Sequence, residues 1–536
     1  MIRIVTAVFV VTLLTSISAA RSAGLFSPAD GAPREPRDVV TSAQPPAAPR
    51  LAGVFGDVDR LFKAFVAERH VPGAAWGVIV DGRVAHVGVA GMRDVASKAP
   101  VDADTVFRIA SMTKSFTAMA ILKLRDEGKL SLDDAAERYV PEMAAMKYPT
   151  SDAPRITIRH LLSHAEGFPE DNPWGDRHLA DTEEQLSRML RGGIPFSNAP
   201  GIAYEYSNYG FAILGRIVSN VSKVKYGDYI AASVLRPLGM TSTTLEPAEV
   251  AANRLAHGYR WEDAQWKNEP LLANGSFGSM GGMLTSVRDL SRYVGVFLSA
   301  WPPHDGPETA PIRRSSLREM QHLWSPTPAL VTRDRAGAVR LNSAGYGYGL
   351  RIAQNCSFAT IVSHGGGLPG FGSTMTWLPD YGIGIVAFGN LTYAGPGGVA
   401  INALELIVKK GGLRPRQPVP SPALTDARDK VSRLVANWDD HLADSIAAEN
   451  LFLDQSKDRR RADIERLRAT VGACAVGSGF DSVENALRGV WTLSCEKGKL
   501  EVSITLAPTL PPTVQFLSVR PAPAMPARAE TCPALP

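Results

Sequence analysis

The sequence has few cysteines, little net charge and no long apolar run, and each shortage excludes a class of protein. Its 536 residues include 57 Lys and Arg against 53 Asp and Glu, a formal net charge of +4. So small a charge on so long a chain argues against a nucleic-acid partner. Four cysteines are too few for a disulfide scaffold. The hydrophobic content of 45% predicts a globular protein with a large core.

Sequence motifs of several well-known enzyme sites are also missing. No Gly-x-Ser-x-Gly occurs, which argues against the nucleophile elbow of the α/β-hydrolases. Gly281-Gly282 lacks the lysine and the strand-then-helix context of a phosphate-binding loop, so a tight loop over an active site is the better interpretation. His160 and His164 have the spacing of a helical metal pair, but no third ligand cluster accompanies them. Neither a metal nor a cofactor is expected.

The N-terminus predicts export. Arg3 gives a positively charged start, an apolar stretch runs from Ile4 to Leu14, and a small-residue cleavage site ends at Ala20. Residues 1–20 therefore have the organisation of a signal peptide, and the apolar stretch is short for a membrane span. We expect a periplasmic or secreted protein with no stable membrane span after cleavage. An uncleaved anchor is the alternative.

The most informative motif is Ser-Met-Thr-Lys, from Ser111 to Lys114. Residues three apart on a helix lie on the same face, so the serine hydroxyl and the lysine amine are expected to be neighbours. A serine hydroxyl needs a nearby base to become nucleophilic. A lysine can be that base where burial lowers its pKa. The motif predicts a serine nucleophile that needs no histidine–aspartate pair.

The same spacing occurs twice more, so the surrounding sequence must separate the three matches. An apolar approach from Val106 to Ala110 precedes Ser111, and an apolar pattern typical of a core helix follows from Phe116 to Leu124. Ser222–Lys225 lies in a polar patch, and Ser494–Lys497 lies in a late segment that ends in a Lys-Gly-Lys turn. Ser111 is therefore the predicted nucleophile.

Two later motifs complete a resemblance to a known family. Tyr206-Ser207-Asn208 is the only Tyr-x-Asn in the chain, and His364-Gly-Gly-Gly follows a strand-like run at 358–363. The order Ser-x-x-Lys, Tyr-x-Asn and basic residue-x-Gly on an edge strand resembles the serine β-lactamase and penicillin-binding-protein superfamily. Over residues 51–411 the chain is most similar to the branch of class C β-lactamases, family VIII carboxylesterases, D-aminopeptidases and D,D-peptidases.

The resemblance implies a role for each matched residue. Ser111 would be acylated, and Lys114 would help to remove its proton. Tyr206 would carry the proton to the leaving group, as a phenolate stabilised by nearby cations. Asn208 would hold the substrate and orient Lys114. The substrate implied is a small molecule or a short peptide.

The resemblance also implies an oxyanion hole, made by the backbone N–H groups of Ser111 and Gly367. Glycines such as Gly366 make sense there, because a ligand must approach the strand backbone closely. The third motif nevertheless departs from the Lys-Thr-Gly or Lys-Ser-Gly of β-lactamases. His364 would be mostly neutral at pH 7 and would gain charge as the pH falls. This change fits the esterase and aminopeptidase branches better, and a plain strand residue is the alternative for His364.

The layout predicts an α+β fold of the β-lactamase/transpeptidase type: an antiparallel sheet flanked by helices, with an inserted helical lobe. The elements expected in it are a helix at 54–69, strands at 74–80 and 83–90 joined by an Asp81-Gly82 hairpin turn, strands at 358–363, 372–378 and 383–389, and a helix at 399–409. The Ser111 and Tyr206 motifs fall in the helical middle of the chain. The site is expected between the sheet and the lobe.

The remaining segments are divided by composition. A Pro- and Ala-rich lead over 21–50 and a Pro- and Ala-rich tail over 521–536 are expected to be disordered, and a Pro-rich linker covers 412–422. Between linker and tail, 423–520 predicts a small α+β accessory domain, helical to about 469 and strand-like from 491 to 506. Four cysteines allow three full pairings, of which Cys474–Cys495 is preferred because both flank this unit.

Three functions follow from these predictions. The first is an exported serine hydrolase that acts on esters, amides or D-amino-acid peptides through an acyl-enzyme. The second is a β-lactamase or D,D-carboxypeptidase of the cell wall. The third is a non-catalytic receptor or scaffold on the same fold, against which the intact set of Ser111, Lys114 and Tyr206 argues.

Overall fold

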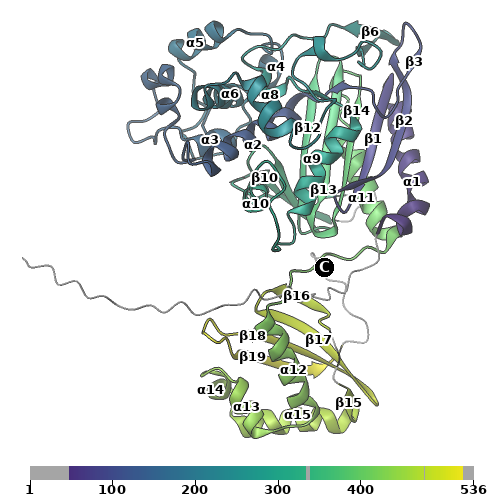
Figure 1. The fold of residues 1–536 in the computed structure, drawn as a ribbon, viewed down its shortest axis with the longest axis vertical. Helices are drawn as coiled ribbons and strands as arrows, with labels where there is room; N and C mark the ends of the chain where they lie inside the picture. The colour runs from purple at the N-terminus through teal and green to yellow at the C-terminus, as the bar shows by residue number, and fades with distance from the viewer. Residues whose placement is uncertain (1–46, 334–338, 476, 478, 523–536) are drawn as a thin grey trace, which may run out of the picture. The chain divides into compact units, whose positions relative to one another are not determined.

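The computed structural model describes residues 47–333, 339–475, 477 and 479–522 (Figure 1). The predicted signal peptide, most of the predicted lead and all but two residues of the predicted tail lie outside the described residues. Helix α1 spans Ala47–Glu68, so the last four residues of the predicted lead, 47–50, belong to a helix instead.

A ten-stranded antiparallel sheet forms the centre of the N-terminal part, residues 47–411, with the strand order β3-β2-β1-β14-β13-β12-β11-β10-β8 and with β9 beside β10. Strand β1 pairs with β14, which joins the two ends of this part of the chain. The strands are β1 Gly73–Val80, β2 Arg83–Asp94, β3 Ala99–Pro100, β8 Ser325–Pro326, β9 Leu330–Arg333, β10 Val339–Tyr346, β11 Arg351–Asn355, β12 Ile361–Leu368, β13 Phe371–Leu378 and β14 Ile383–Gly389.

The predicted hairpin between β1 and β2 is confirmed. Asp81 has a φ of 47° and Gly82 a φ of 77°, and a two-residue turn with positive φ at both positions matches the twist of the strands that it joins. Every residue of β1 is buried. This is expected of a central strand covered on both faces.

Helices cover both faces of the sheet (Figure 1). Helices α1 and α11 (Gly397–Gly411) pack on one face, where Phe62 and Leu404 share a core with Trp76 and Ile385. Helix α9 (Val287–Ser299) packs on the other face, in a core that includes Ala75, Ile79 and Val386. The predicted α+β fold is confirmed, with both flanking helices longer than expected.

An inserted helical lobe follows β4, as predicted. Its helices are α2 Thr113–Asp126, α3 Ile158–Leu162, α4 Asn172–Gly175, α5 Glu183–Gly192, α6 Asn208–Ser222, α7 Tyr226–Ile230 and α8 Gly278–Gly281. The shorter elements of this part are β4 Phe107–Arg108, η1 Ala110–Met112, η2 Ala136–Arg138, η3 Pro141–Ala145, η4 Ala231–Leu235, η5 Pro247–Glu249, β5 Gly258–Glu262, β6 Gln265–Glu269, β7 Leu284–Thr285, α10 Arg314–Met320 and η6 Pro379–Tyr381.

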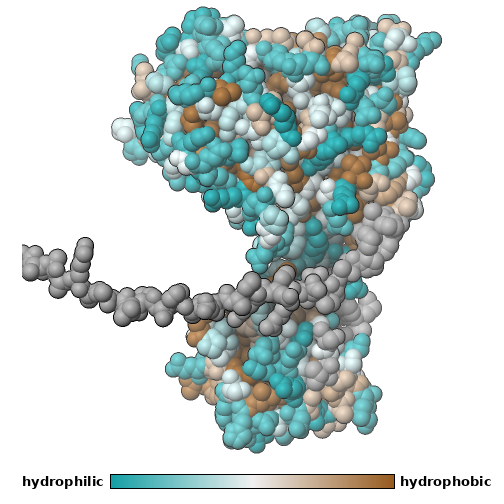
Figure 2. All heavy atoms as spheres, in the orientation of Figure 1, coloured by the Kyte–Doolittle hydropathy of each residue, from teal (hydrophilic) through white to brown (hydrophobic). Residues whose placement is uncertain are grey.

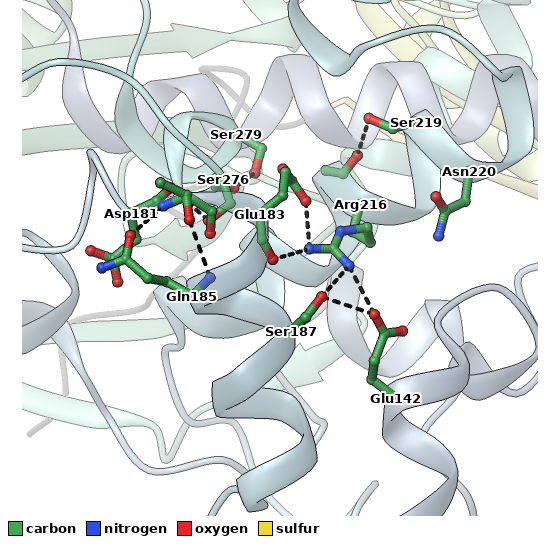
Figure 3. A network of polar contacts seen from close by, with 12 residues as sticks. Glu142, Asp181, Glu183, Gln185, Ser187, Arg216, Ser219, Asn220, Ser276 and Ser279 are labelled. Atoms are coloured by element: carbon green, nitrogen blue, oxygen red, sulfur yellow. Dashed lines mark hydrogen bonds and ion pairs between the residues drawn. The ribbon is translucent and has the colours of Figure 1, made fainter.

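A polar network fixes the packing of this lobe (Figure 3). From α6, the Arg216 guanidinium donates to Glu142 Oε1 and to Ser187 Oγ, each at 3.1 Å, and so connects η3, α5 and α6. Ser279 Oγ of α8 donates to the Phe211 carbonyl of α6 at 2.9 Å. The beginning of α6 and the short helix α8 both contribute to the site described below, so this network sets their separation.

The C-terminal part has its own hydrophobic core, in which Trp491, Leu500 and Val502 pack against Val431. A five-stranded sheet has the order β15-β17-β18-β19, with β16 beside β17. The elements are α12 Pro422–Ala436, α13 Asp440–Ile446, α14 Leu451–Asp454, α15 Lys457–Val471, β15 Cys474–Ala475, β16 Ser482–Asn485, β17 Arg488–Cys495, β18 Gly498–Leu506 and β19 Val514–Pro521. The predicted Cys474–Cys495 disulfide is confirmed, and it joins register partners of β15 and β17.

The visible face of each part mixes many hydrophilic side chains with scattered apolar ones (Figure 2), as on the surface of most folded proteins. Within the described ranges, no helix combines the length and the hydrophobicity needed to cross a membrane.

Candidate active site

Ser111 lies in a strained turn between a strand and a helix. The prediction placed it on a helix with Lys114, but Ser111 belongs to the 3-10 turn η1, and α2 begins two residues later. The residue before it, Ala110, has a φ of 48°, a left-handed conformation that costs a non-glycine residue about 1–3 kcal/mol. Such strain is typical of functional sites. The turn still brings Lys114 Nζ to 3.2 Å from Ser111 Oγ.

Lys114 is fully buried and donates two further hydrogen bonds to oxygen atoms. Its Nζ donates to Asn208 Oδ1 at 2.6 Å and to the Met280 carbonyl at 2.9 Å. Burial lowers the pKa of Lys114 to about 7, because the interior disfavours the ammonium form, while Asp171 and Asp176 oppose this shift. A substantial fraction of the protein therefore carries a neutral amine near pH 7.

A neutral amine at this position has its lone pair free for Ser111. It has two N–H bonds and one lone pair, whereas the ammonium form has three N–H bonds. Asn208 Oδ1 and the Met280 carbonyl can only accept, so they use the two N–H groups. The lone pair is then left for the third neighbour, the Ser111 hydroxyl. This arrangement is that of a general base for the serine.

Asn208 is oriented by the way in which α6 begins. The Asp171 carboxylate accepts hydrogen bonds from the backbone N–H groups of Asn208 and Tyr209, at 2.6 and 2.8 Å, and Ser207 Oγ accepts from Gly210 N at 3.0 Å. These acceptors satisfy the free N–H groups of the first helical turn. The predicted role of Asn208 in orienting Lys114 agrees with this geometry.

Tyr206 lies beside Lys114, but a ground-state phenolate does not fit its surroundings. Lys114 Nζ is 4.8 Å from the centroid of the Tyr206 ring. Burial raises the pKa of Tyr206 well above its ordinary value, and a hydrogen bond with Ser111 and the charge of Arg351 offset only part of the shift. The phenolate interpretation is therefore corrected: the neutral hydroxyl is the stable form, and Lys114 is the better base.

His364 is not the titrating cation that the third motif predicted. Burial and, to a smaller extent, the charges of Arg351 and Lys114 together lower the pKa of His364 to about 3. Its Nδ1 lies 2.6 Å from the Gly365 carbonyl, which can only accept. Nδ1 therefore carries the proton, and Nε2 accepts from the Tyr346 hydroxyl at 2.7 Å. The ring stays neutral at ordinary pH, so falling pH does not create a carboxylate-binding charge here.

The glycines of the third motif let β12 approach the Ser111 turn. The resemblance implied that β12 is an edge strand, and this expectation is wrong because β12 pairs with β11. The pairing covers only Ile361–Ser363. The glycine half of β12 therefore has no hydrogen-bonded partner strand on that side. A Cβ on Gly366 would lie 2.1 Å from the Ile109 carbonyl. Ser373 Oγ of β13 donates to this same carbonyl at 2.8 Å. Gly367, the predicted oxyanion donor, is next along the strand.

The other Ser-x-x-Lys matches form no comparable site. Ser222 Oγ donates to the nearby Val224 carbonyl, and Lys225 is exposed. Ser494 and Lys497 are both exposed. Of the three Ser-x-x-Lys sequences, only Ser111–Lys114 has a buried lysine and lies beside Tyr206.

The two histidines with metal-like spacing have separate structural roles. His160 Nδ1 accepts from Thr157 N in a helix cap, and His164 Nδ1 accepts from Ser207 N. Across the part of the chain that the structure describes, no group of three or more His, Cys, Asp or Glu side chains is placed to hold a metal ion.

Three residues near the site were missed by the sequence analysis. The carbonyl of Met280 is a partner of Lys114, although backbone atoms leave no signal in sequence. Asp176 is buried, and burial raises its pKa to about 6, while Lys114 and the Tyr393 hydroxyl at 3.0 Å stabilise its charged form. Arg351 is exposed, with its guanidinium carbon 5.9 Å from the centroid of the Tyr206 ring. Neither charged side chain belongs to a recognisable motif.

Comparisons with known proteins agree with this site. The β-lactamase family model matches residues 58–409, more than half of the chain, so the chain belongs to the β-lactamase family. Protein flp of Staphylococcus aureus is 29% identical over 340 residues, which cover 62% of this chain and 62% of that protein. Penicillin-binding protein 4* of Bacillus subtilis is 26% identical over 305 residues, which cover 54% of this chain and 62% of that protein. The chain thus spans about 62% of the length of these curated relatives.

Solved structures show the same fold. The octameric penicillin-binding protein homologue from Pyrococcus abyssi has a TM-score of 0.57 at 23% identity, covering 84% of this chain and 96% of that chain. A class C β-lactamase has a TM-score of 0.53 at 20% identity, covering 66% and 96%.

The contact between β12 and the Ser111 turn generates the first prediction. We expect Gly366→Ala to reduce kcat at least about a hundredfold, because the added methyl group pushes the oxyanion strand away from Ser111. Gly365→Ala is the matched control, since its Cβ would lie 3.7 Å from the nearest atom, the Ser373 carbonyl. Steady-state kinetics on p-nitrophenyl acetate, with circular dichroism to verify folding, would measure both. Equal activity of the two variants would contradict the proposed strand placement.

The second prediction concerns pH. Lys114 must be neutral to accept a proton, so kcat/KM should fall as the pH decreases through about 7, the pKa of Lys114. The Asp176 carboxylate stabilises the ammonium form. We therefore expect Asp176→Asn to lower this pKa and to move the acidic limb of the profile to lower pH. A limb that stays in place, or moves to higher pH, would show that Lys114 is not the titrating base.

Proposed function

We propose that this protein is an exported serine hydrolase that forms an acyl-enzyme on Ser111 and acts on esters, amides or D-amino-acid peptides. The observation that carries the proposal is the environment of Lys114. Its amine is buried, its pKa is lowered to about 7, and two obligatory acceptors use its N–H groups. Ser111 faces the remaining lone pair.

The reaction would proceed in two halves. Ser111 Oγ attacks the substrate carbonyl while its proton moves to Lys114 Nζ, and the backbone N–H groups of Ser111 and Gly367 stabilise the oxyanion. The tetrahedral intermediate collapses and the bond to the leaving group breaks. Tyr206 gives its hydroxyl proton to the leaving group and receives the proton held by Lys114, which restores the neutral amine. Water then attacks the acyl-enzyme while Lys114 takes one of its protons, and this proton passes to Ser111 Oγ as the acid leaves.

Two features support export to an oxidising compartment. Residues 1–20 have the pattern of a signal peptide. The Cys474–Cys495 disulfide is of a kind that persists in the periplasm or outside the cell and is rare in the cytosol. We therefore propose a periplasmic or secreted location.

Covalent labelling tests the nucleophile directly. We expect a fluorophosphonate probe to add one label to the wild type, detected by intact mass, and Ser111→Ala to lose both the label and ester hydrolysis. Ser222→Ala is the matched control, because it alters a second Ser-x-x-Lys sequence, and it should keep both. Labelling of Ser111→Ala at the wild-type rate would exclude the proposed nucleophile. A wild type that neither labels nor hydrolyses any ester would favour the non-catalytic alternative.

The cell-wall alternative makes a different prediction. In the family, the lysine and hydroxyl of the third motif bind the substrate carboxylate, but here His364 is neutral and Gly365 has no hydroxyl. A rigid β-lactam holds its carboxylate in one place and cannot seek another partner. We expect p-nitrophenyl acetate to be hydrolysed faster than nitrocefin at pH 7.5. The reverse order would favour the β-lactamase function.

A further inference from the structure

His164 holds the chain on both sides of Tyr206. It is the second histidine of the pair with metal-like spacing, and it is fully buried. Its backbone carbonyl accepts from Glu205 N at 2.8 Å, and its ring Nδ1 accepts from Ser207 N at 3.1 Å. These two N–H groups flank Tyr206 in the sequence. One residue therefore fixes the backbone on either side of the proposed proton relay.

The ring of His164 also packs against the ring of Tyr206. The two ring centroids are 4.4 Å apart, and the ring planes are inclined by 42°. The ring of Tyr346 lies 4.5 Å from the His164 ring, and the Tyr346 hydroxyl is bonded to His364 Nε2 at 2.7 Å. The imidazole of His164 thus contacts both the relay tyrosine and a tyrosine that the third motif holds in place.

Nδ1 of His164 is a permanent acceptor. A ring nitrogen that accepts from a backbone N–H carries no proton, so the proton of the neutral ring is on Nε2. Burial lowers the pKa of His164 well below its ordinary value, because the interior disfavours the charged ring. The ring therefore stays neutral at ordinary pH, and Nδ1 keeps the lone pair that the N–H of Ser207 needs.

The backbone of His164 is held in an uncommon conformation. Its φ is 57°, in the left-handed region that few residues other than glycine adopt, with histidine and asparagine among the more tolerant. Such conformations persist only where the surrounding structure enforces them, and they gather at functional sites. In this conformation both the carbonyl and the ring of His164 reach the Tyr206 segment.

We propose that His164 is the positioning residue of Tyr206: it sets where the Tyr206 hydroxyl lies and so determines how well the protein hydrolyses substrates whose leaving group must be protonated. These substrates are alkyl esters and amides, because an alkoxide or an amide ion is too basic to leave without a proton. In that step Tyr206 gives its proton to the leaving group and receives the proton held by Lys114. The proposal rests on the proposed hydrolase function and deepens it.

Two acetate esters isolate the protonation step. Benzyl acetate has a leaving group that must be protonated, whereas p-nitrophenyl acetate releases a stable anion. Both form the same acetyl-enzyme, so a difference between them arises before deacylation. The quantity to measure is the ratio of kcat/KM for benzyl acetate to kcat/KM for p-nitrophenyl acetate at pH 7.5. A substitution that only loosens the fold lowers both values and leaves this ratio unchanged.

His164→Asn and His164→Leu form a matched pair. Both lack the ring and have nearly the same shape, but only the asparagine places an acceptor, its Oδ1, where His164 Nδ1 lies. We expect His164→Leu to lower the ratio at least about tenfold, because a positioned acid–base group contributes about 10²–10⁴-fold and a displaced group contributes less. His164→Asn should stay within about threefold of the wild type. Tyr206→Phe, which removes the hydroxyl itself, should lower the ratio at least as far as His164→Leu.

His160→Leu is the control for the loss of a histidine from the same part of the chain. His160 Nδ1 also accepts from a backbone N–H, that of Thr157, but this bond caps α3 and does not involve the Tyr206 segment. Its ratio should equal that of the wild type, and circular dichroism verifies the folding of each variant. If His164→Leu does not fold, His164→Gln takes its place, because the glutamine amide lies one bond farther from the backbone and does not occupy the Nδ1 position.

Three outcomes would overturn the proposal: an unchanged ratio in His164→Leu or its glutamine replacement, an equal fall in His164→Asn, or an equal fall in His160→Leu. An unchanged ratio in Tyr206→Phe would overturn it too, because the Tyr206 hydroxyl would then not protonate the leaving group. Failure of the proposed function would look different. In that case the wild type would hydrolyse neither ester, or Ser111→Ala would hydrolyse both at the wild-type rate.

Discussion

The removal of one amine from water is the constraint on which the rest of the site depends. Lys114 is fully buried, and a buried ammonium is costly unless its pKa falls or opposite charges approach. In this site the pKa of Lys114 falls, and opposite charges also approach the amine. Burial lowers the pKa, and Asp171 and Asp176 return part of the shift, which leaves the pKa near 7. The amine is therefore held where it can accept and release a proton under ordinary conditions.

The burial that acts on the Lys114 amine also sets the protonation states of the neighbouring side chains. Tyr206 and His364 share its interior, and the same burial that makes Lys114 less basic keeps both of them neutral. The permanent charge of Arg351 stays outside, in contact with solvent. The groups placed to exchange a proton with Ser111 are therefore buried, and the permanent positive charge near them lies at the surface.

Short motifs predicted the reacting groups well, because each motif places several interacting side chains within a few residues. Ser111, Lys114, Tyr206 and Asn208 do meet, and the Asp81-Gly82 turn and the Cys474–Cys495 pair are present. The charge states were predicted poorly, since they depend on burial by distant segments. The phenolate of Tyr206 and the titration of His364 both failed for this reason.

Other elements escaped prediction because their signals are not local. The carbonyl of Met280 contacts Lys114 only through the packing of α8 on α6. For the glycine half of β12, the residue pattern predicted no strand beyond residue 363, because glycine has low strand propensity, and only the resemblance placed the third motif on a strand. Pairing with β13 makes it a strand nonetheless. Strand β19 in the C-terminal part was not expected, although it pairs along most of β18.

The pairing of β1 with β14 determines the stage of folding at which the site around Ser111 is complete. Ala74 lies opposite Gly389, and the turn that carries Ser111 is completed by β12 and β13, which come far later in the chain. Contacts so distant in sequence make folding slow, because a long segment must be ordered before they form. A growing chain therefore contains Ser111 and Lys114 before β12 and β13 have been made. The arrangement around Ser111 stays incomplete until nearly the whole N-terminal part has folded.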